Sequence, residues 1–417
     1  MAQQKEAAEG YKFTDGKTIK STSVKNQFRS GTCWCYSALS WLESEIMRAG
    51  GEEMDLSEMW IVRNIYFEKA VKYVRLHGAL NFAVGGAFHD VTEGIKKYGI
   101  VPQEVYQGLN YGTELPHFNE IDAVLKAYVD AIIKNPNRTL TTAWQAGLNG
   151  ILDAYFGKMP ETFEYKGTTY TPQSFAASLP INMDDYVSLS SFTHHPFYST
   201  FVIEVPDNWM WASVHNVPLE ELMAVIDNAL ANDYAIGWAS DVSEKGFSRT
   251  KAVAIVPEDN IDNMSGTDAE RWGAMSEKER NQALYSFDKP GKEKSITQQM
   301  RQEAYDNYQT TDDHGMVIMG TATDQCGNPY FKVKNSWGTN SPYQGYYYFS
   351  RPFVEYKTMS IMVNRNAIPK SIRKKLNLSF ALIRSYLLPL TKSTRKGTYV
   401  QYYPSRVFLP SVASMTF

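Results

Sequence analysis

The chain is poor in cysteine and has no long apolar run. Three of its 417 residues are cysteines, an odd and sparse set that is not a disulfide framework and fits a reducing compartment. No apolar stretch reaches the roughly 18 to 20 residues needed to span a bilayer. The opening stretch, Met1 to Glu6, is polar and has no apolar signal-peptide core. We therefore predict a cytoplasmic protein without membrane association. A mature exported protein given a new start Met would look the same.

The three cysteines also lack a metal-binding pattern. One residue separates Cys33 from Cys35, no histidine lies near them in sequence, and Cys326 is remote. Zinc sites use wider pairs of cysteines, combined with further cysteine or histidine ligands. The sequence predicts neither a metal nor a cofactor.

A strong excess of charge of one sign is likewise missing. The 42 lysines and arginines nearly balance the 45 aspartates and glutamates, and the pI is about 6.2. This balance argues against binding to nucleic acid or to a membrane surface. Residues 379–417 differ, because they contain basic but no acidic side chains. They are either a disordered tail or a non-native extension such as a frame-shifted end, and we favour the second interpretation.

What is present is ordinary globular material, 43% hydrophobic and 13% aromatic, enough for a large core. Apolar residues at helical spacing predict helices over residues 32–48, 56–77, 88–98, 120–133, 141–156 and 218–231. Alternating and β-branched runs predict strands over 201–205, 235–238, 251–256, 316–320, 330–334, 346–350 and 360–363. The chain therefore begins with helices and ends with antiparallel strands, an α+β arrangement of two lobes.

One thiol stands at the start of the first predicted helix. Backbone N–H groups and the helix dipole favour a thiolate at Cys33, and a nearby imidazole would lower its pKa further. A buried structural cysteine is the plainer interpretation. Gln27 precedes it by six residues, and a tight loop between them could bring the Gln27 amide and the Cys33 N–H together as an oxyanion hole.

An imidazole and a second amide lie on the predicted β part. His314 opens a strand, and Asn335 follows after a strand, a turn and a strand. In a hairpin the Asn335 side chain can bind one ring nitrogen and turn the other toward Cys33. Trp337, two residues further on, can shield that hydrogen bond from water or simply pack in the core. Thiol, imidazole and two amides are the groups that thiol-based acyl transfer needs.

These residues resemble the papain-like cysteine peptidases. The resemblance rests on Gln27, Cys33-Trp34, His314 and the run Asn335-Ser336-Trp337-Gly338. Cys33 and His314 are much further apart than the about 130 to 150 residues of papain itself, which indicates a large insertion. With that insertion, the chain is similar to the bleomycin hydrolase and aminopeptidase C branch. Supporting segments are 85–90, 97–102, 241–243, 312–316 and 333–338.

The resemblance implies a papain-like two-lobe fold with a large, mostly helical insertion. It divides the chain into a polar extension (1–20), a helical lobe with the nucleophile (21–107), an insertion and lobe crossover (108–300), an antiparallel β lobe with His and Asn (301–378) and the atypical basic tail (379–417). It also implies a homo-oligomer, a hexamer, whose C-terminal arm lies in the cleft and restricts cleavage to N-terminal residues. The extra tail puts that restriction in question.

Roles are implied at single positions. Cys33 resembles the nucleophile, His314 the general base and acid, Asn335 the orienting amide and Gln27 the oxyanion donor. Gly85 and Gly86 resemble the segment whose backbone binds an extended peptide, and we include Trp337 among the substrate-binding residues.

The sequence thus predicts a cysteine aminopeptidase acting on peptides through a thioester. Two alternatives remain, namely a papain-like endopeptidase and a catalytically silent peptide-binding protein on the same fold.

Overall fold

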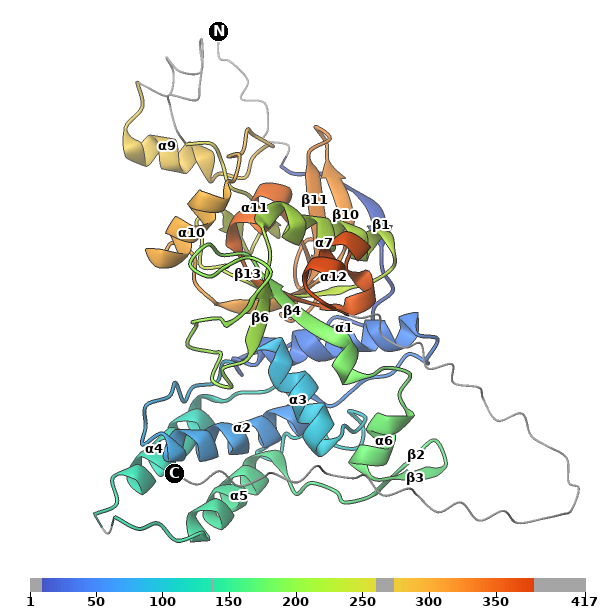
Figure 1. Ribbon diagram of the computed structural model, residues 1–417, viewed down its shortest axis with the longest axis vertical. Coiled ribbons are helices and arrows are strands. Elements are labelled where there is room, and N and C mark those ends of the chain that lie inside the picture. Colours follow the sequence, from blue (N-terminus) through green and yellow to red (C-terminus); the bar gives the residue numbers. More distant parts are fainter. Residues whose placement is uncertain (1–9, 137, 260–273, 379–417) are drawn as a thin grey trace, which may run out of the picture. The chain divides into compact units, whose positions relative to one another are not determined.

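The computed structural model describes residues 10–136, 138–259 and 274–378 (Figure 1). Six helices lie between β1 (Phe13–Thr18) and β4 (Tyr186–Ser190) in the chain: α1 (Cys33–Arg48), α2 (Glu58–Arg75), α3 (Phe88–Tyr98), α4 (Asn119–Ile133), α5 (Ala143–Phe156) and α6 (Pro172–Ser178). Five more helices lie between or after strands: α7 (Leu219–Ala231), α9 (Glu277–Leu284), α10 (Gln298–Asp306), α11 (Arg351–Lys357) and α12 (Lys370–Lys375). No helix in these ranges is long and apolar enough to cross a membrane.

One 11-stranded sheet follows the order β5-β6-β4-β13-β7-β10-β11-β12-β9-β8, with β1 paired to β10. Its strands are β1 (Phe13–Thr18), β4 (Tyr186–Ser190), β5 (Thr200–Val202), β6 (Ser213–Asn216), β7 (Ile236–Ser240), β8 (Phe247–Ser248), β9 (Val253–Ala254), β10 (His314–Asp324), β11 (Pro329–Lys334), β12 (Tyr346–Ser350) and β13 (Thr358–Asn364). A separate hairpin joins β2 (Phe163–Tyr165) to β3 (Thr168–Tyr170).

The structure confirms the predicted α+β fold. The neighbouring strands β10, β11 and β12 of the region 301–378 pair antiparallel, as predicted. The sheet as a whole is mixed, because β4 pairs with β6 and β9 with β12 in parallel. The region 108–300 contains strands β2 to β9 beside its helices. Those strands are two to five residues long, too short for sustained alternation to mark all of them. The five segment boundaries remain a prediction.

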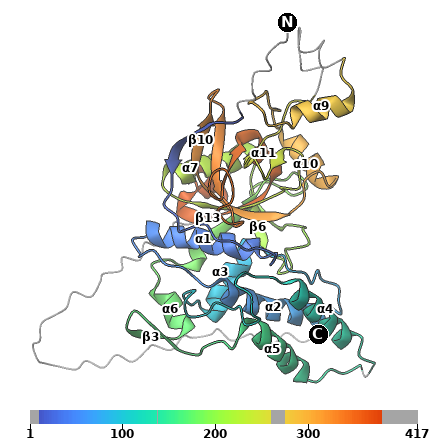
Figure 2. The same ribbon diagram turned by 180° about the vertical axis from the view of Figure 1, so that it is seen from behind.

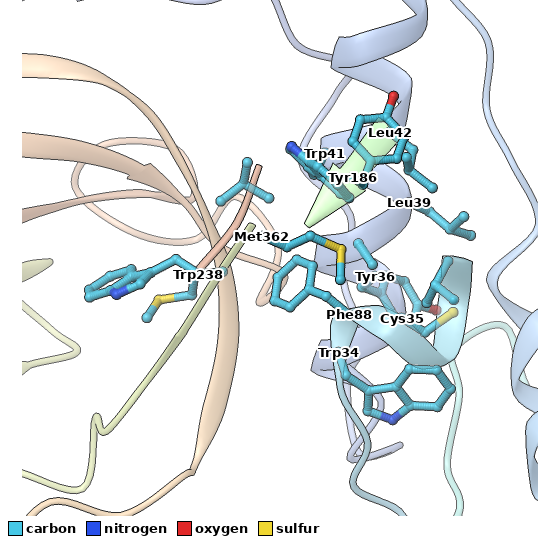
Figure 3. Close-up of a cluster of buried hydrophobic side chains, with 14 of the residues drawn as sticks. Trp34, Cys35, Tyr36, Leu39, Trp41, Leu42, Phe88, Tyr186, Trp238 and Met362 are labelled. Carbon is cyan, nitrogen blue, oxygen red and sulfur yellow. The ribbon is translucent and has the colours of Figure 1, made fainter. Parts of the chain in front are cut away.

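Helix α1 lies between the sheet and helices α2 and α3, as both opposite views show (Figures 1 and 2). Figure 3 shows the buried side chains that fill this interface. Trp41 of α1 donates through its indole N–H to the Ala235 carbonyl at 3.0 Å, and its ring packs edge-on against Tyr186, 4.7 Å away. The middle of α1 is therefore fixed against the sheet by the core itself.

Glycine permits the closest approach of the sheet to the helices. A Cβ on Gly237 of β7 would lie 2.6 Å from the Phe88 ring at the start of α3. Real Cβ atoms essentially never come that close, so the missing side chain is what lets β7 and α3 touch.

Candidate active site

Cys33 is the first residue of α1, and the preceding loop is tightly folded. The Ser30 N–H and hydroxyl both donate to the Gln27 carbonyl, at 3.2 and 2.8 Å. Gly31 has a φ of +65°, and a Cβ there would lie 2.3 Å from Val84. A left-handed conformation against a neighbouring side chain leaves room only for glycine. The loop thereby delivers Cys33 to the beginning of the helix.

His314 and Asn335 are joined as the sequence predicts. His314 begins β10 and Asn335 directly follows β11, its partner in the hairpin. His314 Nε2 lies 2.8 Å from Asn335 Oδ1. The Ser336 N–H also donates to Asn335 Oδ1, at 2.7 Å. The amide oxygen therefore faces the ring, so His314 Nε2 is the donor and Nδ1 keeps its lone pair.

Gly315 brings His314 to Cys33. A Cβ on Gly315 would lie 3.3 Å from the Trp34 Cα and 3.4 Å from the Phe88 ring. The Ser37 hydroxyl of α1 donates to the Gly315 carbonyl at 2.6 Å. These contacts hold the first residues of β10 against the first turn of α1. Cys33 and His314 consequently line one cavity.

Trp337 covers the imidazole. Its ring stacks on His314 with centroids 4.5 Å apart and planes at 24°. The Arg249 guanidinium lies over the indole at 4.7 Å. Stacking covers one face of the imidazole and limits its rotation. Shielding of the hydrogen bond to Asn335 from water remains a prediction.

Gln27 is buried, and Ser336 fixes its side chain and its backbone. Its Oε1 accepts a hydrogen bond from the Ser336 hydroxyl at 2.5 Å, and its backbone N–H donates to the Ser336 carbonyl at 2.8 Å. Because the oxygen is engaged, the Nε2 donors are the part of the amide left to bind another group. Gln27 is not among the residues that line the cavity of Cys33 and His314.

Trp34 positions the Gly85–Gly86 segment. The indole N–H donates to the Val84 carbonyl at 3.0 Å, and a Cβ on Gly86 would lie 2.9 Å from the indole ring. Gly86 lines the cavity, whereas Gly85 does not. Of the predicted site residues, this cavity therefore brings together Cys33, His314 and Gly86.

Burial sets the protonation of the thiol and imidazole. It raises the pKa of Cys33 to about 11, and the nearby carboxylates of Asp207 and Asp312 add to this. Burial lowers the pKa of His314 to about 4 against the opposing effect of Asn335. Burial therefore acts on the Cys33 pKa in the direction opposite to the predicted lowering, while backbone hydrogen bonds act with that lowering. For the thiol and for the imidazole alike, burial favours the neutral form.

Sequence reasoning missed three residues at the site. Ser336 fixes both Gln27 and Asn335, and its place beside Asn335 was a usable signal. Asp207 and Asp312 line the cavity. Asp312 lies two positions before His314, but nothing in the sequence places Asp207 there.

One group in the described ranges has metal-ligating geometry. His194 and His195 each place Nε2 3.2 Å from an oxygen of Glu204, and the three ligand atoms lie within 4.8 Å of one another. The sequence prediction had considered only the cysteines for metal binding.

Two family models match separate parts of the chain. Residues 11–135 match the papain family of cysteine proteases, and residues 266–385 match the peptidase C1-like family. The first match contains Cys33 and Gln27, and the second contains His314 and Asn335.

Relatives span most of the chain. It is 23% identical to aminopeptidase C of Lactobacillus delbrueckii subsp. lactis, covering 85% of this chain and 82% of that protein. It is 24% identical to the mitochondrial cysteine proteinase 1 of Saccharomyces cerevisiae, covering 87% and 79%. The crystal structure of PepW from Lactobacillus rhamnosis matches with a TM-score of 0.64 at 18% identity, over 87% of this chain and 84% of that one.

The fold and these matches define a papain-family cysteine peptidase. Within that family the chain belongs to the peptidase C1-like branch, which includes aminopeptidase C and bleomycin hydrolase.

Proposed function

We propose that this protein is a cysteine aminopeptidase that removes N-terminal residues from peptides. The observation that carries the proposal is the cavity lined by both Cys33 and His314, in which Asn335 engages Nε2 and leaves Nδ1 as the base. A nucleophile next to an oriented base is the arrangement that covalent acyl transfer needs.

In the first half-reaction, His314 Nδ1 takes the thiol proton while Cys33 Sγ attacks the peptide carbonyl carbon. The developing oxyanion is stabilised by Gln27 Nε2 and the Cys33 N–H. The C–N bond then breaks, the imidazolium returns its proton to the leaving amine, and a thioester remains. Because burial favours the neutral forms of both groups, the thiol proton moves to the imidazole as the sulfur attacks, and no ion pair has to form beforehand.

In the second half-reaction, water attacks the thioester carbonyl with His314 as general base. The C–S bond breaks, the amino acid leaves as its carboxylate, and the thiol is restored. Gly86 binds the substrate through its backbone, whereas the Gly85 predicted for the same role lies outside the cavity, against Asp207. Trp337 borders the bound substrate. No step calls for a metal or cofactor.

Removal of the nucleophile tests this function. We expect Cys33→Ala to abolish hydrolysis of aminoacyl amides, while a chelator leaves wild-type activity unchanged. Cys326→Ala is the matched control, because Cys326 is an exposed thiol outside the cavity. Full activity of Cys33→Ala would contradict the proposal.

Two further outcomes distinguish the alternatives. Rapid cleavage of N-terminally blocked peptides would assign an endopeptidase. If the protein binds peptides but hydrolyses neither kind of substrate, it is a catalytically silent binding protein. We also propose a homohexamer, which light scattering after gel filtration measures directly.

A further inference from the structure

The connection from β5 to β6, residues 203–212, covers the glycine segment beside the candidate active site. Asn81 Nδ2 donates to Asp207 Oδ1 at 3.2 Å, and Trp209 Nε1 donates to Asp90 Oδ2 at 2.7 Å. Lys72 binds the Met210 carbonyl at 3.0 Å. Three contacts thus attach this loop, which comes from the sheet, to α2, to α3 and to the chain between them.

The loop closes one end of the cavity. A Cβ on Gly85 would lie 1.9 Å from Asp207 Oδ2, so the carboxylate rests directly on the glycine. An extended peptide advances about 3.3 Å per residue. Cys33, Gly86 and Asp207 line the same cavity, so we expect a peptide that runs from Cys33 along Gly86 to be stopped at Asp207 within its first residues.

Two carboxylates face the space that remains. Asp207 and Asp312 both line the cavity with Cys33. No hydrogen bond or ion pair joins the Asp312 carboxylate to any residue that the structure describes. Burial, together with the charges of Asp207 and Asp313, raises the pKa of Asp312 to about 7. A buried carboxyl group without a partner either takes up a proton or binds a cation, and a cationic group placed between these two would stabilise their charged forms.

The nearest buried cation does not meet this need. The Lys69 ammonium donates to the backbone carbonyls of Ala83 and Gly85, and it forms no ion pair with Asp207 in the described ranges. Lys69 therefore stabilises the backbone of the glycine segment. The carboxylates of Asp207 and Asp312 keep oxygens that can accept from another donor.

The imidazole independently marks this cavity as a place for a ligand. His314 is 6% exposed and lines the cavity. Its Nε2 is bound to Asn335, and its Nδ1 has no partner among the described residues. The ring therefore leaves one acceptor for a group in the cavity, the atom that serves as the base in the proposed mechanism.

We propose that Asp207 and Asp312 bind the α-ammonium group of the substrate at the end of the cavity closed by residues 203–212. This inference rests on the proposed aminopeptidase function and adds the residues that select a free N-terminus. The ammonium group offers three N–H donors, and the two carboxylates, which line the same cavity, offer acceptors. Selection for a chain end would then be built into this loop, close to the thiol.

The test uses the full chain and two reagents that alkylate Cys33. One is an alanyl chloromethyl ketone with a free α-amine, and the other is its N-acetyl form. We expect wild-type protein to react at least about tenfold faster with the free amine, since a charge-assisted hydrogen bond supplies that much or more. Asp207→Asn and Asp312→Asn should each remove most of this preference. The preference is the ratio of the two rates on one protein, so a change in the reactivity of the Cys33 thiol, which both carboxylates influence, cancels.

Glu204→Gln is the matched control. It makes the same change in charge within the same loop, but Glu204 is exposed and does not line the cavity. It should keep the wild-type preference. Asparagine is nearly isosteric and still accepts from Asn81, and an unchanged thermal unfolding midpoint would show that the fold survives.

The inference is overturned if wild-type protein shows no preference for the free amine, or if Asp207→Asn keeps it. It is also overturned if an N-acetyl-arginyl reagent reacts fastest, because the carboxylates would then bind a side chain. The proposed function fails separately, when Cys33 is labelled but aminoacyl amides are not hydrolysed. Alkylation does not need turnover, so that failure leaves the measured preference readable.

Discussion

At the residue scale, the arrangement of the candidate site depends on which atom of Asn335 faces His314. The Ser336 N–H settles this by donating to the same amide oxygen that accepts from the imidazole. A side chain that is bound twice holds the ring in one tautomer and one rotation.

We predict that Asn335→Ala lowers kcat by roughly tenfold to a hundredfold with little change in KM. The imidazole loses its orienting acceptor, and small misplacements of catalytic groups cost rates of this order. Steady-state kinetics on an aminoacyl amide measures the effect. Asn232→Ala, an exposed amide at the end of α7, is the control. An unchanged kcat for Asn335→Ala would argue against the orienting role.

The buried imidazole also makes stability depend on pH. Burial lowers the pKa of His314 to about 4, whereas an unfolded histidine titrates near about 6.5. Between these values the unfolded chain binds more protons, so stability falls as the pH is lowered. From pH 6.5 to pH 5 the loss approaches ~2 kcal/mol at ~1.4 kcal/mol per pKa unit.

His314→Gln removes this titration while keeping a donor for Asn335. We expect urea unfolding to show a smaller loss of stability between pH 7 and pH 5 in the variant than in the wild type. Buried carboxylates contribute equally to both proteins and cancel in the comparison. Equal losses would mean that His314 is not held neutral by burial.

At the element scale, glycines mark two points at which the sheet contacts the helices. Gly237 of β7 accepts the Phe88 ring, and Gly315 of β10 accepts the first turn of α1. Both strands carry glycine at the point where they touch a helix. The contact between sheet and helices, on which the position of His314 depends, therefore tolerates little added volume.

Gly237→Ala should destabilise the protein by about 1–3 kcal/mol, the usual cost of overpacking. Its Cβ would meet the Phe88 ring at 2.6 Å, while a Cβ on Gly150 of α5 meets nothing within 4 Å. Gly150→Ala should instead stabilise by about 0.5–1 kcal/mol, because alanine favours a helix interior. Denaturant unfolding of both variants checks the pair. A Gly237→Ala protein as stable as wild type would show that the interface can yield.

At the scale of the whole molecule, one buried arginine ties distant segments together. Arg301 of α10 is 1% exposed. Its guanidinium donates to the Ser191 carbonyl at 2.8 Å, to two carbonyls of α11, and to the Thr358 carbonyl at the start of β13. Its acceptors are backbone carbonyls, so it links elements by hydrogen bonds rather than by an ion pair.

We predict that Arg301→Leu lowers the free energy of unfolding by at least about 2 kcal/mol, because several buried carbonyls lose their donor. Arg75→Leu makes the same change at an exposed position of α2 and should stay within about 0.5 kcal/mol of wild type. Thermal and urea unfolding measure both. A neutral Arg301→Leu would show that the freed carbonyls find other donors or water.

The sequence by itself determined the local elements and the chemical groups. Apolar spacing placed α1, α2 and α3 to within two residues of their ends, because a helix expresses its buried face in every turn. Cys33, His314, Asn335 and Gln27 were identified because their residue types and order resemble a known family. The hairpin geometry of His314 and Asn335 followed from strands adjacent in the chain.

Only the tertiary structure decided what depends on contacts between distant segments. The short strands of the middle region join the sheet through pairings that no local pattern encodes. Asp207 reaches Gly85 across more than a hundred residues of chain, so its place in the cavity could not be read from spacing. The raised pKa of Cys33 likewise comes from burial by the assembled lobes. Desolvation and proximity are properties of the packed molecule, and for that reason the sequence predicted which groups are present but not their protonation or what surrounds them.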